Sequence, residues 1–592
     1  MIQSILSIFK ERKVVFMRKL SIFVAVLILV LSVSVVLGQA TTTTYPQPSE
    51  YGPGILNWGP NVKYGGTLKA YMQWGKLTDS LNPFASFGSS LPIVFSGIYE
   101  PLFYVNPLNG QTTYMLATSY QWKDNNTELV VKIRKDVKWS DGTPFTPQDV
   151  VFTFNLLKQY PALDTAGLWM SNAPTYLTDC YATGDSVIFK LSSPNVNFAS
   201  GIGGTVILPE HIWSKVKDPQ TWTNLNPIGT GPLLFKSFNP SLNMVTAVRN
   251  PNYWMKGRPY INELQITSVD TVEAEMLAML KHQADFSYGV VSDVQDTWVT
   301  KDPSINKIWW PVWGTQTLFL NTQKYPFSIP TFRIAIDLAI DKSSIEQKSY
   351  FNMGGVANVL GILPNEVKEW IDPTLVASVD YLSGYHPKEA AALLSSIGFK
   401  RNSAGVLCDP QGNPLPSFTL VVPNEMPDYI TDALIIAQNL KENLGMNINI
   451  SQTAFGPYVD DLMKGLFDMS IAVNSFGGIQ YRYQTFLPFY SASKIGQTAS
   501  ADWSRYTNPL ITAAIGVYNS TTDLRLQKQA IYTIERIFLM DMPQINFVNA
   551  VRNEEYSELN FVGWPSDSYP YSDGADFSDF GGELMVLNVH LK

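Results

Sequence analysis

The chain has 592 residues, too many for a single hydrophobic core, so about two or three subdomains are expected. Hydrophobic residues make up 45% of it and charged residues 16%, which indicates a globular rather than a disordered protein. The net charge of −8 argues against binding to nucleic acid or to anionic lipid surfaces.

The N-terminal residues have a composition of their own. A basic start at residues 17–19, an apolar run at residues 20–37 and small residues at 38–40 are typical of a secretory signal peptide, and residues 1–16 precede a second possible start. A permanent membrane anchor is the alternative. Without residues 1–40, which carry five basic residues and one acidic residue, the net charge is about −12. We expect a protein of the periplasm or cell exterior, and not a lipoprotein, because no cysteine follows the apolar run.

The next residues are predicted to form an arm and then a strand. Residues 41–60 contain much Thr, Pro, Tyr and Gly and are expected to be an exposed N-terminal arm. Residues 65–70 (GGTLKA) open the first strand, and residues 79–83 (DSLNP) form a loop.

Residues 131–157 predict a strand, a turn and a capped helix in that order. Apolar positions alternate in the first part, and the SDGTP sequence at residues 140–144 is typical of a turn. Thr146 is expected to be the N-cap, Pro147 the first helical residue and Asp149 the acid of a capping box. The helix would bury an apolar face formed by Val150, Val151, Phe154 and Leu157.

The segment around residues 131–155 resembles the signature of the solute-binding protein family 5, whose members deliver peptides, nickel or oligosaccharides to ABC transporters. Further matches run through residues 61–592. They are IYEPLF at 98–103, PIGTGP at 227–232, RNPNYW at 249–254, residues 321–345, and a helix that begins at Pro387 and stops at Gly398.

Alternating βα patterns and this resemblance imply an α/β protein with the two-lobed periplasmic-binding-protein fold (class II, large type). The resemblance implies an interlobe ligand cleft and crossings between the lobes near Leu320 and Asn546, which would let the lobes close over a ligand. We expect lobe one to comprise residues 61–104, 196–320 and 546–592, an inserted smaller domain residues 105–195, and lobe two residues 321–545.

The resemblance also bears on the ligand. Peptide-binding members place an aspartate shortly after the strand that follows an FD dipeptide, where it pairs with the ligand's ammonium group. Here Gly477 stands at that position. A neutral ligand fits better, because Asn474, Ser475 and Gln480 offer amide and hydroxyl groups for sugar hydroxyls, and Phe476, Tyr481 and Tyr483 offer faces for pyranose rings. A shift of the alignment by a few residues is the alternative, with the amine met elsewhere.

Aromatic residues make up 13% of the chain, more than a core requires. Trp313, just before the expected crossing, is the first candidate for stacking on a sugar, and Trp74, with Gln73 at the mouth of the cleft, is the second. Trp309 and Trp310 would point in opposite directions on a strand, so only one can face the cleft. Trp139 and Trp254 belong to family motifs and are expected in the core, and Trp58 is a weak candidate.

The sequence contains none of the common catalytic motifs, and its four histidines have no partner at metal-ligand spacing. Cys180 and Cys408 are interpreted as buried thiols, with a disulfide as the alternative. We therefore expect a monomeric receptor, not an enzyme, without cofactor or metal, that binds a short β-linked oligosaccharide of the cello-, manno- or xylo- type and presents it to the membrane permease of an ABC importer. An oligopeptide receptor is the alternative, and a secreted glycoside hydrolase is the third hypothesis.

Overall fold

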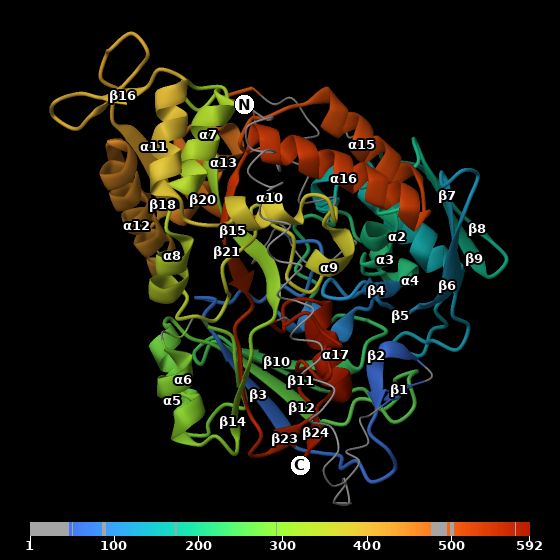
Figure 1. The fold of residues 1–592 in the computed structure, drawn as a ribbon. Helices are drawn as coiled ribbons and strands as arrows, with labels where there is room; N and C mark the ends of the chain where they lie inside the picture. The colour runs from blue at the N-terminus through green and yellow to red at the C-terminus, as the bar shows by residue number, and fades with distance from the viewer. Residues whose placement is uncertain are drawn as a thin grey trace, which may run out of the picture. The chain divides into compact units, whose positions relative to one another are not determined.

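The computed structural model describes residues 47–49, 51–85, 90–171, 175–289, 291, 293–424, 426–474, 494–497, 503–574 and 576–592. Two large sheets organise residues Gln47–Lys592, which form one unit (Figure 1). The seven-stranded sheet has the order β10 (Leu233–Asn239), β11 (Met244–Arg249), β12 (Glu263–Ser268), β3 (Thr67–Met72), β13 (Phe286–Ser287), β22 (Glu554–Ser557), β14 (Asn306–Trp309). The five-stranded sheet has the order β19 (Ile448–Thr453), β18 (Phe418–Pro423), β20 (Met469–Asn474), β15 (Val312–Leu320), β21 (Ile545–Val551).

Each sheet is the centre of one lobe with its own core. The seven-stranded sheet of lobe one packs with α5 (Val272–Leu280) and α17 (Phe580–Asn588). The core of lobe two is built on the five-stranded sheet and its helices, with α13 packed in a smaller apolar cluster on the same sheet. Those helices are α7 (Pro330–Leu338), α8 (Lys342–Ser349), α11 (Pro387–Ser396), α12 (Pro427–Leu444), α13 (Phe455–Lys464), α15 (Pro509–Ser520) and α16 (Leu524–Asp541). The two-lobed α/β fold predicted from the sequence is confirmed.

The chain crosses between the lobes at residues 310–311, before the predicted crossing near Leu320. It crosses back at residues 552–553, after the predicted crossing near Asn546. Strands β15 and β21 pair with each other, and β15 pairs with β20, so both belong to the sheet of lobe two. The reason is burial: Leu318 and Leu320 on β15 are fully buried in the core of lobe two.

A third, four-stranded sheet lies within the range expected for the inserted domain. Its antiparallel order is β6 (Ala117–Lys123), β7 (Glu128–Ile133), β9 (Ser186–Leu191), β8 (Leu177–Thr183), and α2 (Pro147–Gln159) packs against β8 and β9. The predicted capping box is confirmed, because the Thr146 N–H donates to the Asp149 carboxylate at 2.8 Å and Pro147 begins the helix.

Three of the family-like motifs meet in space. The Ser140 N–H of the SDGTP turn donates to the Gly229 carbonyl at 2.9 Å, and the Gly231 N–H donates to the Ile98 carbonyl at 3.0 Å. A side chain at Gly229 would place Cβ 1.9 Å from the Ile98 oxygen. These motifs therefore hold the scaffold of lobe one together.

The prediction of an exposed arm at residues 41–60 is wrong for its described second half. Residues Gly52–Asn57 form strand β2, in which Ile55 is fully buried and the Leu56 N–H donates to the Asn588 side chain at 2.8 Å. The apolar pair Ile55 and Leu56 favours burial over exposure. The Gly- and Pro-rich surroundings obscured this pair in the sequence.

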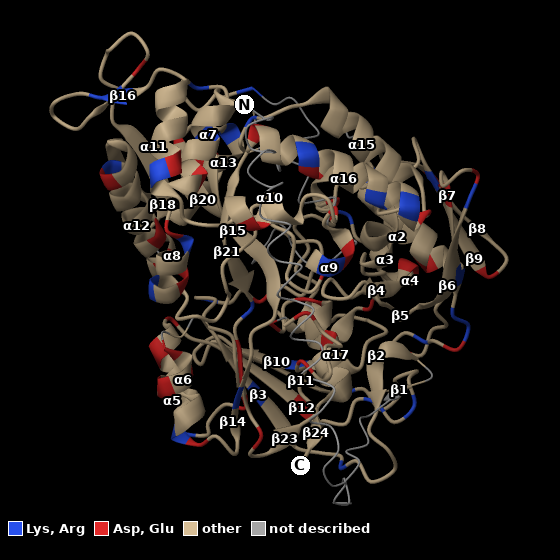
Figure 2. Ribbon diagram, in the orientation of Figure 1, with Lys and Arg blue, Asp and Glu red and all other residues tan. Residues whose placement is uncertain are grey.

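The state of the two cysteines and the distribution of charge on the helices can also be described. Cys180 and Cys408 are both buried free thiols. Figure 2 shows basic residues along α16 and acidic residues on α5 and α6 (Val294–Thr297), so charges of both signs are spread over these elements. Within the described residues no helix is both long enough and apolar enough to cross a membrane.

Candidate ligand-binding site

The predicted residues Gln73 and Trp74 lie at the carboxyl ends of the parallel strands of lobe one. Strands β12, β3 and β13 run parallel, so the residues that follow them gather at one edge of the sheet. Gln73 and Trp74 follow β3, and Tyr288 follows β13. The Trp74 N–H donates to the Ser268 hydroxyl at 3.1 Å, and the exposed Gln73 amide donates to the Asp270 carbonyl at 3.3 Å.

Lobe two contributes Trp313 and Asn474 at one edge of its own sheet. Asn474 ends β20 and pairs in register with Thr315 near the start of β15, two residues after Trp313. The Thr315 hydroxyl donates to the Asn474 carbonyl at 3.1 Å. The Asn474 side chain is 6% exposed, and its amide nitrogen has no hydrogen-bond partner among the described residues. These two predicted residues therefore lie close together beside the crossing.

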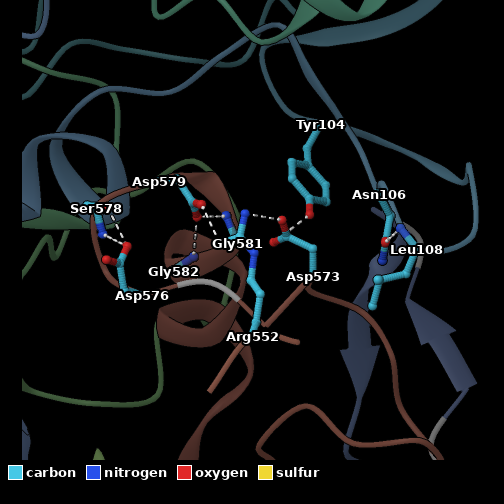
Figure 3. A network of polar contacts seen from close by, with 10 residues as sticks. All are labelled: Tyr104, Asn106, Leu108, Arg552, Asp573, Asp576, Ser578, Asp579, Gly581 and Gly582. Carbon is cyan, nitrogen blue, oxygen red and sulfur yellow. Dashed lines mark hydrogen bonds and ion pairs between the residues drawn. The ribbon is translucent and has the colours of Figure 1, made fainter. Parts of the chain in front are cut away.

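Arg552, which was not predicted as a site residue, connects the two segments that cross between the lobes. Its N–H donates to the Pro311 carbonyl at 3.0 Å, and its guanidinium carbon lies 4.8 Å from the centre of the Trp313 ring. The guanidinium pairs with Asp573 at 3.2 Å and with Asp579 at 3.4 Å (Figure 3). Arg552 is thus fixed between two carboxylates and an aromatic face.

Three aspartates that recur at every third position of the sequence, Asp573, Asp576 and Asp579, surround this guanidinium. Asp579 is the N-cap of α17 and accepts hydrogen bonds from the N–H groups of Gly581 and Gly582 at 2.8 and 3.4 Å. Asp573 also accepts from the Tyr104 hydroxyl at 3.1 Å, as Figure 3 shows. Asp576, on the other side, accepts from the Ser578 N–H at 2.9 Å.

Trp74 joins the same cluster through Asp576. Burial raises the pKa of Asp576, and hydrogen bonds, including one from the Trp74 side chain, act in the opposite direction. Trp74 therefore meets Asp576 on one side of the cluster, while Trp313 meets Arg552 on the other. The two tryptophans predicted as stacking residues converge on one polar network, which we call the Arg552 cluster: Arg552, Asp573, Asp576, Asp579 and Glu554.

Carboxyl groups outnumber the single cation in this cluster. Burial raises the pKa of Asp579 to about 8, and Asp573 adds to the rise. Burial also raises the pKa of Glu554, whose side chain is fully buried with both oxygens unpartnered among the described residues. Burial alone would lower the pKa of Arg552, but the nearby carboxylates, Asp573 first, raise it well above its usual range. Protonated carboxyl groups can both donate and accept hydrogen bonds, as sugar hydroxyls do.

The cluster could have been noticed in the sequence. Asp573, Asp576 and Asp579 recur every third residue in SDGADFSDF, directly before a helix, and Arg552 follows a buried strand. The predicted residues Ser475, Phe476, Gln480 and Tyr481, together with Gly477 and Tyr483, lie outside the described residues.

The other tryptophans have structural partners. Trp139 and Trp254 are 2% and 9% exposed, which confirms their expected place in the core. Trp309 donates to Asp567 and Trp310 to Glu555, both at 3.0 Å, so the two rings reach different partners. Trp58 packs edge-on against Tyr569 and His590 within lobe one.

Two surface hollows are found in lobe one and in the inserted domain. One, of about 780 Å³, is lined by residues 76–79 and by β10, and the other, of about 540 Å³, lies beside Trp169 in the inserted domain. Neither is lined by a predicted binding residue. Among the described residues, no group of three or more His, Cys, Asp and Glu side chains is arranged to hold a metal ion.

Comparisons with known proteins agree with this architecture. The family model of the bacterial extracellular solute-binding proteins, family 5, matches residues 111–497. The periplasmic oligopeptide-binding protein of an oligopeptide ABC transporter from Thermotoga maritima is 25% identical and superimposes with a TM-score of 0.78, covering 89% of this chain and 99% of that one. A second structure of that protein, with mannohexaose bound, gives a TM-score of 0.72 over 90% and 99% of the two chains at 25% identity.

A curated relative extends the comparison to sequence. The periplasmic murein peptide-binding protein MppA of Escherichia coli is 23% identical over 78% of this chain and 84% of its own length. The matched family consists of substrate-binding proteins of ABC transporters, which are not enzymes, and which work with a membrane permease. The chain belongs to the bacterial extracellular solute-binding proteins of family 5 and is a two-lobed receptor of an ABC transporter.

Proposed function

We propose that this receptor binds a short, neutral, β-linked oligosaccharide and closes its two lobes around it. Trp74 and Trp313 would stack on sugar rings, and the Arg552 cluster and Asn474 would bond the hydroxyl groups. Ser475, Phe476, Gln480, Tyr481 and Gln73 would complete the site. The ligand would be carried to the permease of an ABC importer without covalent chemistry.

The convergence of both tryptophans on the Arg552 cluster carries this proposal. Aromatic faces beside planar, charged hydrogen-bonding groups suit a pyranose ring, which has apolar faces and a rim of hydroxyls. Each stacked ring would contribute about 1 kcal/mol beyond its burial. The Thermotoga maritima protein that was solved with mannohexaose supports an oligosaccharide as ligand.

A peptide ligand is the second candidate, and one observation favours it. Four carboxyl groups surround a single arginine in the Arg552 cluster, and such an excess of acid could receive the ammonium group of a peptide. The relatives named for oligopeptides or murein peptide point the same way.

A thermal-shift screen separates the two candidates, because a ligand that binds only the folded state raises the melting temperature by mass action. The panel would contain cellobiose, mannobiose, xylobiose, mannohexaose and a set of tripeptides. The sugar proposal expects a concentration-dependent rise with at least one saccharide and none with the tripeptides. A rise with tripeptides alone would contradict it, and hydrolysis of a bound saccharide would point to a glycosidase instead.

Secretion is part of the proposal. Residues 1–40 would act as a signal peptide, which places the receptor in the periplasm or outside the cell as a monomer without a lipid anchor. N-terminal sequencing of the secreted protein tests this, and a chain that retains residues 20–37 would contradict it.

A further inference from the structure

Helix α15 of lobe two ends against the inserted domain and the segment that leaves it towards lobe one. The Val196 N–H donates to the Asn519 carbonyl at 2.8 Å, and the Asn197 amide donates to the Asn519 side-chain oxygen at 3.1 Å. The Asn126 amide donates to the Ser520 carbonyl at 3.0 Å. All three acceptors belong to the last two residues of α15, and all three donors belong to the inserted sheet or to the segment that leaves it.

The local structure on both sides suits this contact. The last carbonyl groups of a helix have no partner within the helix, so α15 presents acceptors at this end. On the other side, residues 124–126 form the turn between β6 and β7, all three in the left-handed region with φ between 47° and 64°. Asn519 is 7% exposed, so its end of the contact is closed to water, whereas the bond from Asn126 to Ser520 is exposed.

A second amide contact joins the lobes near the Arg552 cluster. The Asn365 side chain of lobe two donates to the Leu108 carbonyl at 2.7 Å. The Leu108 N–H donates to the Asn106 side chain at 2.9 Å (Figure 3). Asn106 in turn donates to the Pro570 carbonyl at 2.8 Å. These two polar contacts therefore hold lobe two in addition to the segments that cross at residues 310–311 and 552–553.

We propose that the inserted domain, through Asn126, and the segment that leaves it, through Val196 and Asn197, form a closure latch, which holds lobe two and so sets the balance between open and closed receptor. The two crossings alone would let the lobes rotate apart, and such a rotation must break contacts that lie away from the crossings. The latch consists of neutral amides and carbonyls. It touches none of the predicted binding residues, so it changes affinity only through the population of the closed form.

The test measures interlobe distance without any ligand. Donor and acceptor dyes would be placed by cysteine substitution at Lys135 of the inserted domain and Arg525 of lobe two, whose side chains are 77% and 69% exposed. Single-molecule energy transfer would then compare the parent with Asn197→Ala, Asn519→Ala and the double variant. Thr178→Ala is the matched control, because its hydroxyl bonds the Lys190 carbonyl inside the inserted sheet.

If the latch holds the lobes together, part of the ligand-free protein without a latch substitution should show a short distance between the two dyes. Each single variant should lower the ratio of closed to open molecules about threefold or more, as expected for a lost neutral hydrogen bond. The double variant should be no worse than either single variant, because both remove the same bond. Unchanged distance distributions in all variants, or a parent that shows only the long distance, would overturn the proposal. No ligand enters this experiment, so the identity of the ligand is tested separately.

Discussion

The guanidinium group of Arg552 lies over the ring of Trp313, 4.8 Å from its centre, where the two lobes are joined. Each residue sits on one of the two segments that cross between the lobes. The indole ring is thus held in position before a ligand arrives, which reduces the entropy lost on binding.

Trp313→Ala should weaken binding of the saccharide found in the screen at least tenfold, which corresponds to about 1.4 kcal/mol. The loss arises because the variant lacks one stacking face, while the strand β15 remains paired on both sides. Calorimetric titration gives the affinity. Trp122→Ala, in the inserted sheet, is the control for loss of a half-buried tryptophan. Equal affinity of both variants would remove Trp313 from the site.

Asp573→Asn should lower the free energy of unfolding by about 1–3 kcal/mol. The change takes one of two carboxylate partners from Arg552, whose side chain is 17% exposed, while Asp579 remains as the other. Asp185→Asn removes the partner of Lys135 in an exposed pair and should have no measurable effect. Denaturant unfolding of both variants measures the difference, and equal stability would mean that the Arg552 cluster does not order the crossing.

The scaffold could be predicted from the sequence much better than the candidate binding site. Local rules sufficed for the capping box at Thr146, because its donors and acceptors lie within a few residues of one another. The Arg552 cluster could not be assembled in this way. Its members lie after β21 and before α17, and only the tertiary fold brings Asp573 back to Arg552 and Tyr104.

The misplaced crossings have a similar origin. Residues 312–320 form an apolar strand that either sheet could have accepted by pattern alone. Its pairing with β20 and β21, which are far away in the sequence, decides the lobe to which it belongs. Trp74 and Trp313 were predicted from their chemistry, but the Arg552 cluster that each of them contacts was not.

Because Glu275 is buried, we expect the free energy of unfolding to depend on pH. Its side chain is fully buried, and burial raises the pKa of Glu275 from 4.5 to about 8. The folded state therefore holds a proton that the unfolded state releases above about pH 4.5. This group contributes full stability at low pH, and its contribution is lost as the pH rises towards 8.

Glu275→Gln should accordingly flatten this dependence. Between pH 5 and pH 8, the parent should lose about 3 kcal/mol more unfolding free energy than the variant. Glu273→Gln on the same helix is the control, since Glu273 is exposed and the variant should follow the parent. Denaturant unfolding at the two pH values gives the difference, and parallel curves for parent and Glu275→Gln would contradict the prediction.

Gly229→Ala should destabilise lobe one by about 2–3 kcal/mol, because Cβ would lie 1.9 Å from the Ile98 oxygen and backbone would have to move. That movement would strain the contact at which the SDGTP, IYEPLF and PIGTGP motifs meet. Gly456→Ala makes the same chemical change on α13, where a Cβ has no neighbour within 4 Å, and should stabilise the protein by about 0.5 kcal/mol through reduced backbone freedom. Thermal and denaturant unfolding of the pair measures the contrast. If both substitutions were equally tolerated, the glycines of the PIGTGP motif would not be required by close backbone packing, and their role would have to be sought in the flexibility of the loop.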